Sequence, residues 1–194
     1  MQPDKTPLNG PAINVTLTTA RLRIEPLNAS HAAPMFEAMR DPVLYQWLSM
    51  EPSPDLAHLQ RRWAWVAGRP LVGVDVLDFG WAVRRVTDGA WIGKMDAEVT
   101  AQGVASNVGY VFLAAYWGQG YATEAVTALS DHLRRHGVVR QRATVTLGND
   151  ASCRVLEHAG FERERVIVGN DTVRGVLVDD VEYVRLTTLA RRPR

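Results

Sequence analysis

The chain has 194 residues, 22 Lys and Arg against 21 Asp and Glu, and a single cysteine. This length fits one domain that buries roughly 70% of its unfolded surface, so neither a disulfide nor a metal is needed to stabilise it. The balanced charge argues against a nucleic-acid-binding surface, and no apolar run approaches the ~18 residues of a membrane span. The lone Cys153 and the lack of a basic-then-apolar leader favour a cytoplasmic protein.

The N-terminal part is expected to hold one strand and two helices. Residues 1–14, with Pro3, Pro7 and Pro11, read as a flexible arm before a single domain at 15–188. After a strand near 22–27, Asn28 or Ser30 is the expected cap of a helix that ends at Asp41-Pro42. Ser53 as N-cap, with Pro54 at the first helical position, predicts a second helix that ends before Gly68.

Three consecutive strands are expected at residues 79–86, 91–100 and 104–113. The turns between them contain Gly89 and Gly103, and short glycine turns join antiparallel neighbours. The sequence therefore predicts an antiparallel meander.

The segment 107–124 carries the most information, because it reads as a strand, a glycine loop and a helix start. Gly118 and Gly120 let a backbone approach a ligand, and the free amides of a first helical turn attract anions. The loop lacks the lysine of a P-loop and the third glycine of the dinucleotide fingerprint. A pyrophosphate is expected here, while ATP and NAD are poor candidates.

The rest of the chain continues the alternation of helices and strands. A helix with apolar residues on one stripe is expected to end near Gly137, and a strand with alternating apolar residues follows at 143–147. Asn149 or Asp150 caps a short helix that Gly160 closes, and strands at about 163–173 and 176–188 come before a basic tail at 189–194. The fold class is α+β, with a mixed, mostly antiparallel central sheet flanked by helices.

Two motifs together carry a family resemblance. Tyr116-Trp-Gly-Gln-Gly-Tyr-Ala-Thr-Glu-Ala125 and Asn149-Asp-Ala-Ser-Cys-Arg-Val-Leu-Glu-His-Ala-Gly-Phe161 resemble the GNAT N-acetyltransferases, in particular the RimJ/RimL-like branch of ribosomal-protein N-terminal acetyltransferases. The likeness extends over about residues 15–188.

This resemblance implies a GNAT fold and a donor substrate, acetyl-CoA or a related acyl-CoA, with no metal. The pyrophosphate would lie on the amides of 117–122, the strand end at 111–113 would pair with the pantetheine arm, and its amides would polarise the thioester carbonyl. The cofactor-binding residues implied are Val111, Phe112, Leu113, Trp117, Gly118, Gln119, Gly120, Tyr121, Ala122, Thr123, Asn149, Ser152 and Arg154.

The catalytic groups match the family less completely than the cofactor-binding residues do. Many GNAT enzymes use a tyrosine as general acid where this chain has Leu156, so Ser152 is the better candidate, although it could equally cap a helix or bind cofactor. Asn107 stands where the branch often has a glutamate base, and an amide can position water but cannot accept the proton. Asp96 and Glu98 are alternative carboxylates, for which a solvated strand face is the stronger interpretation.

A weak base favours an acceptor that is already partly neutral. An α-amine with pKa near ~7.8 is roughly one third neutral at pH 7.5, whereas a lysine amine near ~10.4 is only about 0.1% neutral. The sequence therefore predicts acetylation of a primary amine, with a protein N-terminus as the favoured acceptor. Acetylation of a small-molecule amine and a non-catalytic acyl-CoA sensor are the alternatives, and a homodimer is one compatible assembly.

Other features suggest weaker hypotheses. Tyr45 and Trp47 lie between the two early helices and are candidates for an acceptor pocket, whereas Trp63 fits a buried stripe. His132 and His136 are four residues apart on a helix but lack a third metal ligand, so a surface helix is the better interpretation. The basic tail is more simply read as solvated than as an RNA contact.

Overall fold

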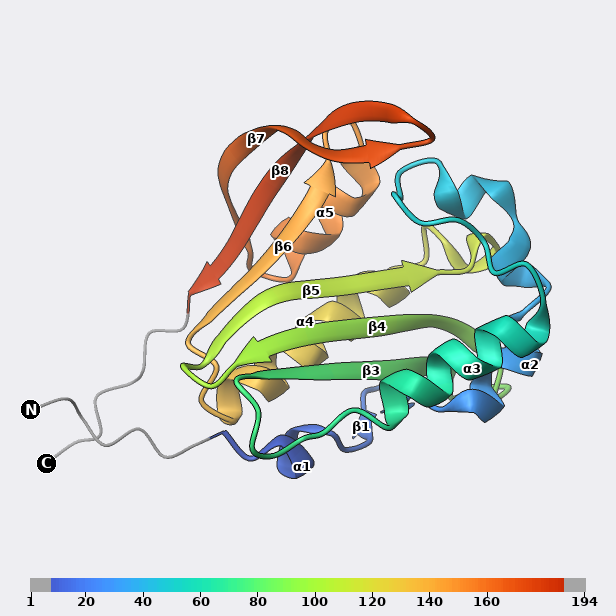
Figure 1. Ribbon diagram of the computed structural model, residues 1–194, viewed down its shortest axis with the longest axis horizontal. Helices are drawn as coiled ribbons and strands as arrows, with labels where there is room; N and C mark the ends of the chain where they lie inside the picture. The colour runs from blue at the N-terminus through green and yellow to red at the C-terminus, as the bar shows by residue number, and fades with distance from the viewer. Residues whose placement is uncertain (1–7, 187–194) are drawn as a thin grey trace, which may run out of the picture.

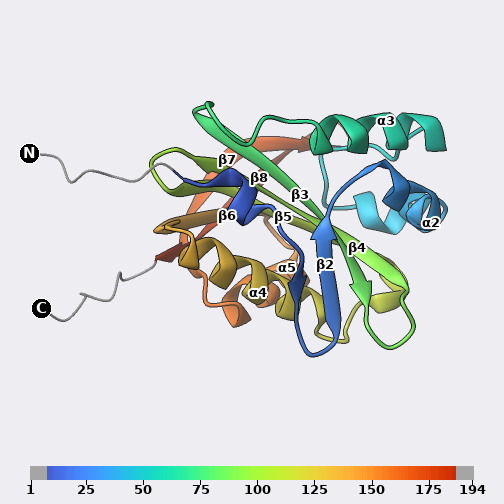
Figure 2. The same ribbon diagram turned by 90° about the horizontal axis from the view of Figure 1, so that it is seen from below.

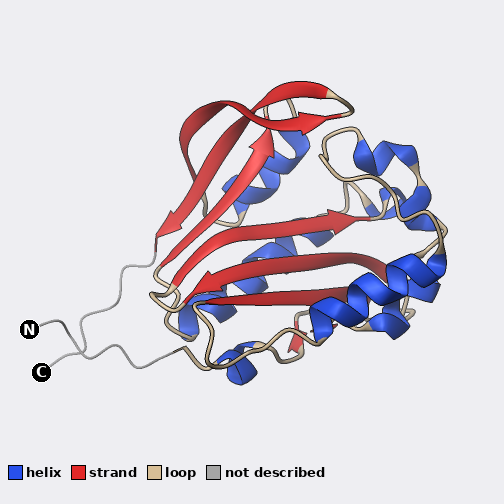
Figure 3. Cartoon of the chain, in the orientation of Figure 1, coloured by secondary structure: helices blue, strands red, loops and turns tan. Residues whose placement is uncertain are grey.

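The computed structural model describes residues 8–186 and is built on an eight-stranded sheet with the order β1-β2-β3-β4-β5-β6-β8-β7 (Figures 1 and 3). β5 and β6 are parallel, and the other neighbouring pairs are antiparallel. The predicted α+β class is confirmed. The strands are β1 Leu17–Thr18, β2 Leu22–Pro26, β3 Val76–Arg85, β4 Trp91–Thr100, β5 Val104–Phe112, β6 Arg140–Thr146, β7 Glu162–Val173 and β8 Val176–Leu186.

The meander predicted from the sequence is β3, β4 and β5. Each of its two turns contains a glycine with positive φ, +71° at Gly89 and +77° at Gly103, a conformation that residues with a Cβ rarely adopt. The turn chemistry and the apolar alternation therefore agree, which is why this part of the sheet could be read from the sequence.

Helices cover both faces of the sheet (Figures 1 and 2). α4 (Tyr121–Arg135) and α5 (Asp150–His158) lie on one face, and α2 (Ala32–Met35) and α3 (Leu56–Ala67) lie on the other. The predicted stripe of α4 is fully buried at Ala125, Val126, Leu129 and Leu133. The two apolar faces of the sheet thus support two separate buried clusters.

The sheet opens between β5 and β6, which pair only through Val104 with Arg140 and Ala105 with Gln141. Beyond these residues the two strands diverge, as Figure 1 shows, and β6 continues beside β8 alone. The divergence leaves one edge of β5 without a partner strand in the middle of the sheet.

The first predicted helix is not continuous. The chain instead forms short pieces, η1 (Ala29–His31), α2, η2 (Ala38–Arg40) and η3 (Pro42–Tyr45). Pro34, inside α2, lacks the N–H that would bond the Ser30 carbonyl, which accounts for the break between η1 and α2. Asn28 is the cap of the first piece, and its side chain accepts from the Ser30 N–H at 2.9 Å.

The cap of α3 also differs from the prediction. Asp55 rather than Ser53 is the N-cap, because the Asp55 carboxylate accepts from the His58 N–H at 2.6 Å. The Ser53 hydroxyl lies 3.3 Å from the His58 ring instead. An acidic side chain at this end also interacts favourably with the positive end of the helix dipole.

The predicted flexible arm must be shortened. Residues 8–14 contain α1 (Gly10–Ile13), which Asn9 caps, and Ile13 is completely buried in the main core. His132 on α4 is hydrogen-bonded through Nε2 to the Ile13 carbonyl at 2.9 Å, and burial lowers the pKa of this histidine. Residues 1–7 of the arm and the basic tail at 189–194 lie outside the described residues.

Neither a membrane-spanning helix nor a metal-binding cluster is found among the described residues. Between residues 8 and 186 no helix is long and apolar enough to cross a membrane. Within the same range no group of three or more His, Cys, Asp or Glu side chains is arranged to hold a metal ion, and His132 and His136 contact each other, with ring centroids 4.5 Å apart.

Candidate functional site

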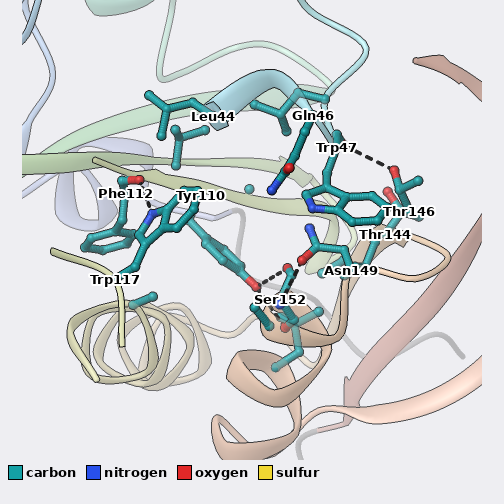
Figure 4. Close-up of a pocket in the computed structure, with 18 of the residues that line it drawn as sticks. Leu44, Gln46, Trp47, Tyr110, Phe112, Trp117, Thr144, Thr146, Asn149 and Ser152 are labelled. Carbon is teal, nitrogen blue, oxygen red and sulfur yellow. Dashed lines mark hydrogen bonds between the residues drawn. The ribbon is translucent and has the colours of Figure 1, made fainter. Parts of the chain in front are cut away.

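The opening of the sheet contains a cavity of about 550 Å³. Its walls come from β5, the glycine loop and start of α4, the end of β6, the start of α5, the β7–β8 hairpin and the segment 43–49 (Figure 4). Elements far apart in the sequence therefore meet at the place where the sheet lacks a strand.

The glycine loop leads into α4 as predicted. Gly118 and Gly120 have φ values of +70° and +76°, and Gly120 is the N-cap of the helix. The first intrahelical bond runs from the Glu124 N–H to the Gly120 carbonyl, so the N–H groups of residues 121–123 have no partner within the helix. These amides border the cavity and suit a phosphate.

Arg21, the residue before β2, contacts both the glycine loop and the start of α4. Its Nε lies 2.6 Å from a Glu124 carboxylate oxygen, its Nη1 donates to the Gln119 carbonyl at 2.9 Å, and its guanidinium lies 4.6 Å above the Tyr121 ring. Burial alone would raise the pKa of Glu124, but hydrogen bonds from Thr19 and Arg21 outweigh it and lower that pKa. Sequence reasoning missed Arg21, whose only signal was its place in the motif Thr-Thr-Ala-Arg-Leu.

The open edge of β5 presents the peptide groups of Tyr110 and Phe112. The Leu113 N–H donates to the Ile92 carbonyl of β4 at 2.9 Å, and successive peptide groups of a strand point to opposite sides. The Phe112 carbonyl accepts from Trp117 Nε1 at 2.6 Å. An extended ligand can pair with the other peptide groups of this edge.

Tyr110 and Ser152 meet across the cavity (Figure 4). Their hydroxyl oxygens are 2.7 Å apart, and the phenol also lies 3.2 Å from the Ser152 carbonyl. Burial raises the pKa of Tyr110 to about 12, so this phenol stays protonated at neutral pH. The Asn149 side chain accepts from the Ser152 N–H at 3.2 Å and fixes the start of α5.

Tyr110 is a second residue that sequence reasoning missed. Its only sequence signal is the Gly-Tyr pair on β5, yet it lines the same cavity as Leu156, the position at which the family resemblance implies a tyrosine acid. A single phenol has one proton, which it donates either to the Ser152 carbonyl or to the Ser152 hydroxyl.

Asn107 lines the cavity, whereas the two neighbouring carboxylates do not. The Asn107 amide donates to Asp96 at 3.3 Å, and Lys94 contacts the other oxygen of that carboxylate at 2.7 Å. Glu98 contacts Ser106 and is exposed. Asp96 lies over Gly109, where an added Cβ would come within 2.3 Å of its carboxylate.

The early aromatic residues divide into three groups. Trp47 lines the cavity, and its carbonyl accepts from the Thr146 hydroxyl at 3.2 Å. Tyr45 is buried outside the cavity, where its hydroxyl donates to the Met39 carbonyl at 2.7 Å and burial raises its pKa. Trp63 is buried in the core, and Trp65 is 63% exposed.

Two aspartates of the β7–β8 hairpin, Asp171 and Asp180, also line the cavity. Asp180 is only 4% exposed, and Asn170 donates to one of its carboxylate oxygens at 2.7 Å. Sequence reasoning assigned neither aspartate to the site, because no local pattern says which strand face meets a cavity.

Most of the predicted cofactor residues lie in the cavity walls, but three do not. Leu113 is buried and uses its N–H within the sheet, the Gln119 carbonyl is taken by Arg21, and the Arg154 side chain is exposed. Cys153 packs against the main core. The predicted residues that line the cavity are Asn107, Val111, Phe112, Trp117, Gly118, Gly120, Tyr121, Ala122, Thr123, Asn149 and Ser152.

Comparison with known proteins connects this geometry to a family. Residues 21–162 match the family model described as an acetyltransferase (GNAT) domain. A search of curated proteins found no match.

Solved structures share the fold at low sequence identity. A GNAT-family structure from Chromobacterium violaceum has a TM-score of 0.79 and 20% identity, covering 96% of this chain and 92% of its own. Mycobacterium smegmatis RimJ in complex with CoA-disulfide has a TM-score of 0.76 and 22% identity, with coverages of 85% and 81%. The ribosomal-protein-S5-alanine acetyltransferase from Vibrio fischeri has a TM-score of 0.75 and 18% identity, with coverages of 89% and 96%.

Proposed function

The chain belongs to the GNAT acetyltransferase family and is an acyl-CoA-dependent acetyltransferase, and on this premise we propose that its acceptor is the α-amine of a peptide or protein N-terminus. The observation that carries the proposal is the donor-side cavity in which Asn107, not a carboxylate, occupies the β5 wall. The ribosomal-protein acetyltransferases among the similar structures agree with an N-terminal acceptor. The lone Cys153 suits the reducing cytoplasm in which ribosomal substrates occur.

In this proposal the donor's pyrophosphate lies on the amides of residues 121–123, which have no partner within α4. The pantetheine arm pairs with the open edge of β5, where the peptide groups of Tyr110 and Phe112 face the cavity. Asn149 and Ser152, at the start of α5, border the sulfur end of the donor. The fit rests on the unpaired strand edge and the positive-φ glycines of the loop.

The reaction is a direct acyl transfer. The neutral amine attacks the thioester carbonyl carbon, a C–N bond forms, and the carbonyl electrons move to oxygen, where a β5 backbone N–H stabilises the charge. Collapse of this intermediate breaks the C–S bond and releases the CoA thiolate. Ser152 gives its hydroxyl proton to the thiolate, and the Tyr110 phenol, 2.7 Å away, replaces that proton. The proton that leaves the attacking nitrogen passes through water and restores the phenol, so the products are the amide and the CoA thiol.

The class of acceptor follows from deprotonation, because the acceptor's ammonium group must lose a proton before the amine can attack. Asn107 can hold a water molecule but cannot take the proton, and Lys94 already neutralises its neighbour Asp96. Keeping a lysine amine neutral at pH 7.5 costs roughly 3 kcal/mol more than keeping an α-amine neutral. Because neither Asn107 nor Asp96 on the β5 side takes up this proton, an amine with a lower pKa is favoured as the acceptor.

The test is an acylation assay at pH 7.5 with acetyl-CoA and two peptides, read by mass spectrometry. One peptide has a free α-amine and no lysine, and the other has a blocked N-terminus and one lysine. We expect the first to gain an acetyl group at least ten times faster than the second. Efficient lysine modification with an untouched α-amine would reject the proposal.

A matched control separates catalysis from binding. Ser152→Ala should slow the acetylation while acetyl-CoA still binds, as measured by calorimetry. Wild-type protein that binds acetyl-CoA but modifies neither peptide would point to a small-molecule amine as acceptor or to an acyl-CoA sensor.

A further inference from the structure

The charged side chains that line the cavity are all negative. Of the residues that line it in the described part of the chain, only Asp171 and Asp180 carry a formal charge at neutral pH, and neither lysine, arginine nor histidine is among them. Both aspartates come from the β7–β8 hairpin. A ligand group beside this wall therefore meets negative charge and no compensating cation.

Asp180 is the unusual member of the pair. Asn170 satisfies its Oδ2, but its buried Oδ1 has no hydrogen-bond partner, and no cation between residues 8 and 186 forms an ion pair with it. Glu182, two residues further along β8, provides the contrast, because Arg165 and Arg142 contact its carboxylate at 2.8 and 4.0 Å. An uncompensated buried carboxylate is unfavourable unless a positive group approaches it.

Asp171 is the accessible member. It is half-buried, and its Oδ1 accepts from the Thr172 N–H at 2.7 Å, which leaves its other carboxylate oxygen for a ligand. Asp171 pairs with Val178 on the antiparallel strand, two residues from Asp180, so both aspartates contribute to the same wall of the cavity. One carboxylate can touch a bound ammonium group, and the other acts on it through the low-dielectric wall.

We propose that Asp171 and Asp180 form the acceptor's ammonium subsite, and that this subsite selects amines with no carboxylate beside the amino group. The inference rests on the proposed function and narrows its acceptor class. A peptide N-terminus satisfies the requirement, because its first carboxyl group is an uncharged amide. A free amino acid does not, because its carboxylate would lie next to two aspartates with no arginine or lysine in the wall to receive it.

The probes are alaninamide and alanine, which differ in the carboxylate. The measurement is the ratio of kcat/KM for the two acceptors with the wild-type protein, Asp171→Asn, Asp180→Asn and the control Asp179→Asn. Asp179 precedes Asp180 on β8 but accepts from the Gly169 N–H and does not line the cavity. Comparing ratios between variants cancels the different amine pKa values of the two probes.

We expect the wild-type protein to prefer alaninamide by at least 30-fold. Each of the two cavity variants should lower this ratio about 10-fold, mainly through KM, while acetyl-CoA affinity and the Asp179→Asn ratio stay unchanged. Ratios within 2-fold of wild type in both cavity variants would overturn the subsite.

Two results distinguish this inference from the proposed function. Equal use of alanine and alaninamide by the wild-type protein would overturn the subsite and leave N-terminal acetylation standing. Faster acetylation of the lysine peptide than of the α-amine peptide, with an alaninamide-to-alanine ratio that still depends on the aspartates, would overturn the acceptor proposal and support the subsite. Should Asp180→Asn fail to fold, its carboxylate is structural, and the Asp171→Asn ratio decides.

Discussion

The hydroxyl of Thr146 donates to the carbonyl of Trp47 at 3.2 Å and so joins the end of β6 to the segment 43–49 (Figure 4). These residues lie 99 positions apart and line the same cavity. The Trp47 ring also lies over Gly148, where an added Cβ would come within 3.4 Å of it. The segment 43–49 is thus joined to the end of β6, the strand that diverges from β5.

Replacing Thr146 by valine should loosen that wall. The change keeps the shape but removes the hydroxyl, at a cost of about 1 kcal/mol for one lost hydrogen bond. We expect the KM for the peptide acceptor to rise several-fold while the Kd for acetyl-CoA is unchanged, as steady-state kinetics and calorimetry would show. Thr146→Ser keeps the hydroxyl and should behave like wild type. A larger effect on donor binding than on the acceptor would contradict this role.

Tyr110→Phe tests the proton path through Ser152. Without the phenol, the Ser152 hydroxyl loses the partner 2.7 Å away, and we expect kcat to fall about 10-fold, roughly 1.4 kcal/mol. Ser152→Ala and the double variant complete a double-mutant cycle, and the two effects should be far from additive. Additive losses would mean that the two hydroxyls act independently.

The same tyrosine should make the fold sensitive to alkaline pH. Its folded pKa of about 12 lies above the unfolded value of ~10, so the unfolded chain releases the proton first and the folded state loses stability as pH rises from ~10 towards 12. In denaturant titrations the Tyr110 phenol should account for a loss of about 2.7 kcal/mol at most, and Tyr110→Phe should remove this contribution. Tyr116→Phe, a control at another cavity tyrosine, should keep it. An identical alkaline decline in all three proteins would show that other groups cause it.

Gly118→Ala and Gly89→Ala form a matched pair. Both glycines have positive φ, +70° and +71°, and open space where a methyl group would stand, so each substitution should cost about 1–2 kcal/mol of stability. Only Gly118 borders the cavity, and its methyl group would meet the donor's pyrophosphate. Calorimetry should show at least a 10-fold loss of CoA affinity for Gly118→Ala alone. Equal CoA affinities for the two variants would show that the pyrophosphate does not bind at this loop.

Arg21→Ala should weaken CoA binding without touching the ligand. The side chain bonds both the Gln119 carbonyl and the Glu124 carboxylate, so its loss frees the loop from the helix it precedes. We expect the Kd for CoA to rise between 3- and 10-fold. Arg23→Ala removes a neighbouring arginine that contacts Glu25, and CoA affinity should not change. A shift of the same size in both variants would indicate a general charge effect.

Local patterns predicted the parts of the fold that depend on local chemistry. The meander, α4 and the glycine loop follow from apolar period and from turn residues, which act over a few positions. The spacing of apolar residues alone predicts a continuous helix through Pro34. The structure has shorter pieces instead, because the proline outweighs that spacing.

The remaining site residues depend on contacts that no local pattern encodes. Arg21 reaches Gln119 across 98 positions, and Tyr110 reaches Ser152 across 42. Arg154 lies outside the cavity because two residues along a helix is about 200° of rotation, which turns its side chain away from the face that carries Ser152. Leu113 lies outside it because the peptide groups of a strand alternate between its two sides.

The unpaired edge of β5 has a consequence for the stability of the protein. In the proposed binding mode the donor fills the gap beside β5. A ligand held at 100 times its Kd adds about 2.7 kcal/mol to the stability of the folded state. Amide hydrogens facing the gap should then exchange slowly when CoA is plentiful and quickly when it is scarce. Resistance to unfolding and to proteolysis should therefore rise with the concentration of CoA.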